Sequence, residues 1–321
     1  MLIQLLKKAW HFNRLLTLAG LLHIALVPVL LVAMVADPQV ITGVNGWIKP
    51  LKFAISLPIY SFTVTWLLTY VEGRRRLVQG IANITGAVAL IETTLITLQV
   101  IRGTTSHFNV STAFDAAVFS TMGTAITILA TANLITVILL ALQRMDDAVF
   151  ATALRLGALT SFVGMTVAFL MTSGPTPSQR AALEAGGNLS IVGAHSVGVE
   201  DGGPGLPLVG WSTVGGDLRV AHFVGLHGLQ LLPLLGFLLT RRGARRRYNE
   251  GQRSGVVWIA GVAYVAWIGI LTWQALRGQS LIAPDGQTVL AYLLLIGSVV
   301  TALALTTFVK SKPQEVSATV L

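Results

Sequence analysis

Eight long apolar segments, separated by short polar ones, run along this chain of 321 residues. A helix rises about 1.5 Å per residue, so roughly 20 apolar residues cross about 30 Å of hydrocarbon. Backbone groups in lipid must bond to one another within a segment, so each segment is expected to be a helix. The predicted spans are 15–36, 52–71, 78–101, 114–142, 152–172, 219–240, 256–276 and 288–309.

The composition supports the same class. Hydrophobic residues make up 54% of the chain and charged residues only 11%, whereas a soluble domain carries about 25% charged residues. So little charge cannot cover a water-soluble globule, and the lipid bilayer is the expected solvent and partner. The sequence therefore predicts an all-α, polytopic integral membrane bundle that forms one transmembrane domain over residues 1–321.

The residue types and motifs that the sequence lacks exclude several kinds of catalytic and metal site. Cysteine is absent, which excludes disulfides, thiolate nucleophiles, iron–sulfur clusters and cysteine-ligated metals or haem. The sequence also lacks the His-Glu-x-x-His zinc motif, a Walker loop and a Gly-x-Ser-x-Gly nucleophile elbow. A metal site in this chain would need histidine, carboxylate or backbone oxygen ligands.

The positive charge is distributed as a topology signal. The formal net charge is +9, but Lys and Arg gather at segment ends, which predicts membrane orientation and no nucleic-acid partner. With the N-terminus inside, 16 of the 22 Lys and Arg residues, including Lys310 and Lys312, are cytoplasmic. We therefore predict a multi-pass protein of the plasma (inner) membrane with both termini inside. The six outer cations are Lys49, Lys52, Arg102, Arg180, Arg219 and Arg277.

One long segment, residues 173–218, separates the fifth and sixth spans on the predicted outer side. It is rich in Gly, Pro and Ser, and Leu206, Leu208, Val209 and Trp211 interrupt the turn residues. Loops of this length are usually functional or disordered. The apolar residues favour a cap folded over the outer mouth of the bundle.

Three ionisable residues fall well inside the spans, away from their ends: His23, Glu92 and His227. Ionisable groups in hydrocarbon are costly and are seldom kept without a use. Glu92 and His227 lie about nine or ten residues from the outer ends of their spans and His23 about thirteen, which we interpret as a similar depth at 1.5 Å per residue. This makes a single buried polar centre possible. The structural alternatives are a hydrogen-bonded neutral imidazole for each histidine and a protonated helix–helix contact for Glu92.

Further polar residues extend this centre. Gln99 follows Glu92 by seven positions and shares its helix face, and Gln230 lies about 60° from His227 on the sixth span. His222 and His227 are about 140° apart, so one straight helix cannot readily present both to one metal. They are expected to serve different sites.

The outer rim holds a second candidate site. Four cations at one interface suit an anionic group such as a phosphate, a carboxylate or the propionates of haem. Lys and Arg side chains reaching out of the membrane are the alternative explanation. The rim residues are Lys49, Lys52, Arg102, His107, Asp115, Asp217, Arg219 and His222.

These residues leave three functions open. In a redox or cofactor protein, His23 and His227 ligate haem b or a metal, Glu92, Gln99 and Gln230 manage protons, and the rim holds propionates or a quinone-like substrate. In a proton-coupled transporter, Glu92 carries the proton and His227 and Gln230 line the pathway. The third possibility is a non-catalytic assembly or sensor subunit.

Overall fold

The computed structural model describes residues 2–308. Within that range, eight helices are long and apolar enough to cross a membrane, which confirms a helical, multi-pass membrane protein. Residue 309 of the last predicted span, and Lys310 and Lys312, lie outside the described residues. The eight helices are α2 (Arg14–Ala36), α3 (Ile48–Leu68), α4 (Arg75–Ile101), α5 (Ala113–Leu142), α6 (Ala148–Met171), α8 (Leu218–Thr240), α10 (Glu250–Leu276) and α11 (Gly286–Phe308).

Each of the eight helices begins earlier than its apolar segment, whereas α3 ends at Leu68, before its predicted end at 71. The largest difference is at α10, which begins at Glu250 although its apolar segment begins at 256. The Asn249 side chain accepts a hydrogen bond from the backbone N–H of Gln252 and caps this helix. Capped polar turns can continue a helix beyond the hydrocarbon, because water and side chains satisfy its last backbone groups.

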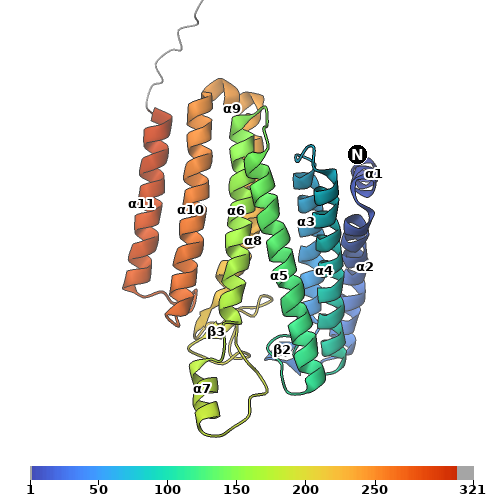
Figure 1. Ribbon diagram of the computed structural model, residues 1–321. Coiled ribbons are helices and arrows are strands. Elements are labelled where there is room, and N and C mark those ends of the chain that lie inside the picture. The colour runs from blue at the N-terminus through green and yellow to red at the C-terminus, as the bar shows by residue number, and fades with distance from the viewer. Residues whose placement is uncertain (1, 309–321) are drawn as a thin grey trace, which may run out of the picture.

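The loops divide the bundle into two ends (Figure 1). At one end lie α1, the short α9 (Arg242–Arg247) and the arginines of residues 74–76; we call it the arginine end. At the other end lie α7 (Pro177–Glu184) and four short strands; we call it the cap end. The strands are β1 (Val40–Ile41), β2 (Val44–Asn45), β3 (Ser196–Val197) and β4 (Gly216–Asp217).

Two groups of helices meet along α5 (Figure 1). Helices α2, α3 and α4 pack together on one side, and α6, α8, α10 and α11 on the other. Helix α5 runs obliquely, beside α6 at the arginine end and beside α4 at the cap end. Near the arginine end both groups share one apolar core, in which Leu67, Ile81, Leu140, Leu154 and Leu229 are buried.

Helices α6 and α8 approach most closely through glycine. A Cβ atom added to Gly225 would lie 2.3 Å from the Cα of Gly164. A Cβ atom added to Gly228 would likewise lie 2.0 Å from the hydroxyl oxygen of Thr160. Small residues allow backbones to pack directly in lipid, where no hydrophobic force draws helices together. This pair therefore forms a closely packed unit.

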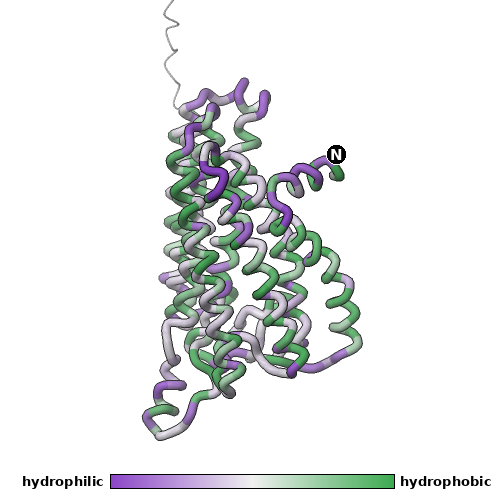
Figure 2. Tube along the Cα trace, turned by 45° about the vertical axis from the view of Figure 1, so that its right-hand side comes forward, coloured by the Kyte–Doolittle hydropathy of each residue, from purple (hydrophilic) through white to green (hydrophobic). Residues whose placement is uncertain are grey.

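Helix α1 (Leu2–Phe12) is an addition to the predicted elements. Figure 2 shows it projecting from the bundle at the arginine end, with hydrophilic and hydrophobic residues alternating along it. Lys7 and Lys8 are exposed, and so are the apolar side chains of Ile3, Leu5 and Trp10. An amphipathic helix with these features is typical of the membrane surface. It is too short to span, so a search for long apolar segments misses it.

The segment predicted as a cap folds against the bundle. β3 pairs with β4, and Val192 N–H donates to Phe108 O of the α4–α5 loop. Ser280, in the α10–α11 loop, donates through its hydroxyl to Ser212 O at 3.1 Å. These contacts connect the cap to both groups of helices.

Candidate functional site

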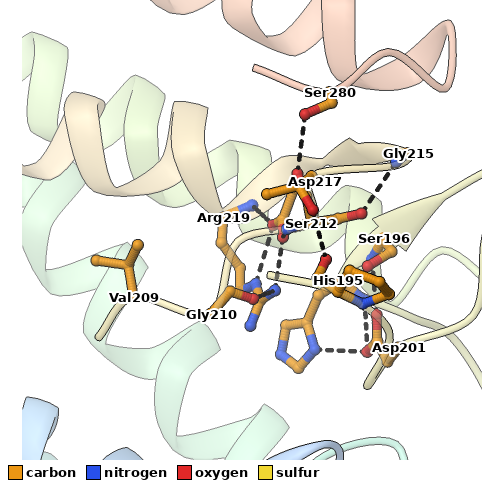
Figure 3. Close-up of polar contacts among 12 residues, drawn as sticks. His195, Ser196, Asp201, Val209, Gly210, Ser212, Gly215, Asp217, Arg219 and Ser280 are labelled. Carbon is orange, nitrogen blue, oxygen red and sulfur yellow. Dashed lines mark hydrogen bonds and ion pairs between the residues drawn. The ribbon is translucent and has the colours of Figure 1, made fainter. Parts of the chain in front are cut away.

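Asp217 organises the start of α8 (Figure 3). Its carboxylate accepts hydrogen bonds from Nε and Nη2 of Arg219, at 2.9 and 2.5 Å, and from the backbone N–H groups of Arg219 and Ser212. The side chain is almost fully buried. An ionised buried carboxylate needs such donors to offset its lost hydration. Asp217 therefore holds Arg219 in one position at the mouth of the bundle.

The cap segment 209–212 lies over two cations. Arg219 Nη2 donates to Gly210 O at 2.6 Å, and Lys52 Nζ of α3 donates to Val209 O at 3.1 Å. One short stretch of cap backbone thus contacts both groups of helices, through α8 and α3. Lys52 also lies close enough to Asp217 and Arg219 for their charges to interact.

Lys49, one helical turn before Lys52, contacts the α4–α5 loop. Its ammonium nitrogen is 3.1 Å from Nδ1 of His107. An ammonium group can only donate, so Nδ1 accepts and the imidazole carries its proton on Nε2. Burial holds the pKa of His107 well below its usual value, and the charge of Lys49 lowers it further. His107 is therefore a neutral side chain beside a cation.

The cap contributes a second histidine, His195 (Figure 3). Asp201 accepts from Nδ1 of His195 at 2.6 Å and from the backbone N–H groups of His195 and Ser196. Burial would raise the pKa of Asp201, but these hydrogen bonds outweigh it and hold the pKa below its usual value. Burial lowers the pKa of His195, although Asp201 opposes this. Nε2 of His195 is left as an acceptor.

These residues form one connected group. The rings of His107 and His195 are stacked with their centroids 6.4 Å apart. The charge of Lys49 interacts with those of Lys52, Arg219 and Asp201. We call this group the cap-end cluster; it consists of Lys49, Lys52, His107, His195, Asp201, Asp217 and Arg219.

Glu92 lies on the α4 face beneath this cluster. It is 2% exposed, and neither carboxyl oxygen has a hydrogen-bond partner in the described part of the chain. Its charge interacts with that of Lys49, although the two groups form no ion pair. A buried carboxyl without partners is costly in its ionised form. It is stable there when it carries a proton or when a cation moves towards it.

His23 contacts Thr93, the residue that follows Glu92, and forms its hydrogen bonds with other groups than Glu92. Its Nδ1 lies 2.6 Å from Ala19 O, which can only accept, so Nδ1 carries the proton. Nε2 lies 2.7 Å from the Thr93 hydroxyl and therefore accepts from it. Both ring nitrogens are satisfied, and the side chain joins α2 to α4.

His227 does not lie with His23 and Glu92 in one buried centre. Its side chain is exposed, on the same face of α8 as the exposed Leu231, Leu234 and Leu238. Helix rotation turns His227 outward, because the glycine face of α8 packs against α6. The expectation of one three-residue centre therefore differs from the structure.

The other predicted residues have separate partners. Gln99 and Arg102 both donate to Asp115, at 2.8 and 2.5 Å, and connect α4 to the start of α5. His222 lies 2.8 Å from Gly164 O of α6. Gln230 donates weakly to Thr63 of α3 at 3.4 Å, and its carbonyl oxygen is buried without a partner among the described residues. None of these four residues, Gln99, Arg102, His222 and Gln230, belongs to the cap-end cluster.

The haem or metal assignment gains no support from these positions. Among residues 2–308, no three His, Asp or Glu side chains are grouped so that they could hold a metal ion. His23 could ligate only by giving up the Thr93 hydroxyl. His227 lies on another face of the bundle, so the two do not form a ligand pair.

Sequence analysis missed His195 and Asp201. Both lie in a glycine-rich loop, where residue spacing does not indicate which side chains meet. The sequence did contain one signal for this pair. Of the six histidines, His195 is the one in the long cap, and it precedes an aspartate, Asp201, by six residues. The chain matches no protein-family profile, no curated protein and no solved structure.

Proposed function

We propose that this protein is a proton-coupled transporter of a small anion. The cap-end cluster binds the anion, and Glu92 carries the proton. The observation that carries this proposal is the buried carboxyl of Glu92, which has no hydrogen-bond partner in the described part of the chain and lies beneath a cluster of cations.

Two lysines supply the attraction for an anion. Arg219 is paired with Asp217, and Asp201 with His195. Lys49 and Lys52 form no ion pair with any carboxylate in residues 2–308. A partly buried cation without a counterion is unfavourable, and a bound anion relieves that cost. Carboxylates and phosphates are the ligand classes that several Lys and Arg donors suit best.

The charge interaction between Lys49 and Glu92 couples anion binding in the cluster to proton binding by Glu92. When Glu92 is ionised, Lys49 is its nearest counter-charge. An anion in the cluster competes for Lys49 and so favours the protonated form of Glu92. By linkage, protonation of Glu92 strengthens anion binding by the same factor. Anion and proton therefore bind together, as symport requires.

The redox or cofactor function remains a prediction, with less support. It rests on His23 and His227 as ligands, and these residues have the separate positions described above. A Soret band in the purified protein that disappears in His23→Ala or His227→Ala would restore it.

The binding half of the proposal is tested by thermal stability in detergent. We expect phosphate or succinate to raise the Tm of the wild type in a concentration-dependent way. The Lys49→Gln/Lys52→Gln double variant should lose this shift, whereas Arg180→Gln, a cation of α7 outside the cluster, should keep it. No shift for the wild type with either anion counts against an anion site.

The coupling half is tested in proteoliposomes containing a pH-sensitive dye. An inward gradient of the binding anion should drive proton uptake in the wild type. Glu92→Gln should bind the anion but move protons at least tenfold more slowly. Unchanged proton uptake in Glu92→Gln would remove it from the carrier role. A wild type that binds but does not transport would favour a sensor or assembly subunit.

We further propose that the cap end faces outward, from the excess of Lys and Arg at the arginine end. Because the chain has no cysteine, single cysteines report their side without background. Ser178→Cys in α7 should react with an impermeant maleimide on intact cells. Gly73→Cys in the α3–α4 loop should react only after permeabilisation. The reverse pattern would invert the topology.

A further inference from the structure

A small cavity lies in the bundle core, on the arginine-end side of Glu92. Its volume is about 10 Å³, and its polar lining residues are Tyr60, Thr85, Asn133 and Thr136. These come from α3, α4 and α5; apolar side chains complete the wall. A cavity of this size has room for roughly one water molecule.

The hydrogen-bonding groups around the cavity are incompletely used. Asn133 is 7% exposed, and its Oδ1 has no partner among the described residues. Its amide nitrogen donates to the Tyr60 hydroxyl at 3.4 Å. Thr85 and Thr136 donate to Ile81 O and Ala132 O of their own helices, which leaves their oxygens free to accept.

One water molecule completes this set. It can donate to Asn133 Oδ1 and to one threonine oxygen, and accept from the Tyr60 hydroxyl. Two to four polar partners are what a buried water requires. An Asn133 oxygen that is buried without a partner would otherwise be unfavourable.

An apolar layer separates this cavity from Glu92. Along α4, Val88 lies between Glu92 and Thr85, one turn from each. Along α5, Leu129 lies one turn before Asn133. Val88, Leu129, Ala125 and Met165 form one buried apolar cluster, with the Tyr60 side chain packed against it. Tyr60 thus contacts the apolar layer with its ring and Asn133 with its hydroxyl.

We propose that the cavity binds one water molecule, and that this water, Tyr60 and Asn133 form the proton-conducting station between Glu92 and the arginine end. This inference rests on the proposed function. When the apolar layer separates, the water accepts the proton released by Glu92 and gives up one of its own protons towards the arginine end. The water molecule has the same composition and charge after the transfer as before it. In the structure, the apolar layer separates the station from Glu92.

The water site can be tested without transport, by X-ray radiolysis of the purified protein and mass spectrometry. Water bound against a buried tyrosine yields hydroxyl radicals that modify it. We expect Tyr60 to be modified in the wild type and about fivefold less in Asn133→Leu, which fills the cavity. Thr131→Leu, at an exposed position on α5, is the matched control and should leave Tyr60 unchanged. An unmodified wild-type Tyr60, or equal modification in Asn133→Leu, would overturn the site.

The conducting role is tested by proton uptake in the same proteoliposomes. Asn133→Leu should slow uptake at least tenfold while keeping the anion-dependent Tm shift, which also shows that the variant folds. Asn133→Asp, which retains an acceptor, should restore most of the rate. Uptake at the wild-type rate in Asn133→Leu refutes the conducting role alone. A wild type that moves no protons refutes the proposed function and this role with it, and leaves the water site to the radiolysis result.

Discussion

The contact between α6 and α8 is built differently from the region where α3, α4 and α8 meet. We call this second region the seam. In the first, Gly164 and Gly225 bring two backbones into direct contact. In the second, long polar side chains meet, and several buried atoms lack partners among the described residues, including Glu92 Oε1, Glu92 Oε2 and Gln230 Oε1. One contact is closely packed and the other is polar and incompletely satisfied.

The difference indicates where the molecule can rearrange. Direct backbone packing tolerates little displacement, because small shifts lose many contacts or cause clashes. Polar side chains with unused hydrogen-bonding capacity can exchange partners at lower cost than directly packed backbones. We therefore expect motion at the seam while α6 and α8 move as one body.

The largest effect is expected from breaking the close contact. Gly225→Val would place side-chain atoms into the backbone of Gly164 and should destabilise the fold by more than about 3 kcal/mol. Gly269→Val is the matched control, because a Cβ atom at Gly269 of α10 meets nothing within 4 Å. The yield of monodisperse protein and its Tm measure this. Equal values for both variants would contradict the rigid-pair interpretation.

Lowering the pH is expected to have a smaller effect, on the stability of the cap, which covers the seam. The pKa values of His107 and His195 are lowered, so below about pH 6.5 the unfolded cap binds more protons than the folded one. Cap stability should fall as the pH drops from 7 to 5, by less than about 1.4 kcal/mol per pH unit for each histidine. Asp201 stays ionised in this range, because its pKa is below the usual value.

Hydrogen exchange of the segment 190–201, corrected for the intrinsic pH dependence, measures this loss. The His107→Gln/His195→Gln variant should show a flat profile between pH 7 and 5. A cap that becomes better protected in acid would reverse the sign and indicate that His195 is charged in the folded state.

The smallest effect on stability is expected at the seam itself. Glu92→Leu removes a buried carboxyl that has no partner to lose, so we expect the Tm to stay the same or rise. In contrast, Asp217→Ala leaves Arg219 without its buried counter-charge and should lower the Tm. A large destabilisation by Glu92→Leu would show that Glu92 is a structural contact.

The sequence predicted the spans because hydrophobic length is a local property. All eight apolar segments correspond to helices, whereas their polar ends were misplaced and the short elements α1, α7, α9 and the four strands were missed. Lys49, Lys52, His107 and Arg219 were also recognised as a rim, since charge at span ends is visible in the chain. His195 and Asp201 were not, because a loop's path cannot be inferred from its spacing.

The sequence by itself thus determined the class of protein and the eight apolar helices that are long enough to span a membrane. Helix length follows from residue count, because every helix rises by the same amount per residue. The tertiary structure decided which groups meet, because helix rotation depends on packing between distant segments. The glycine face of α8 pairs with α6, so His227 faces outward. His23 binds Thr93, and Glu92 is left beneath Lys49 with no hydrogen-bond partner among residues 2–308.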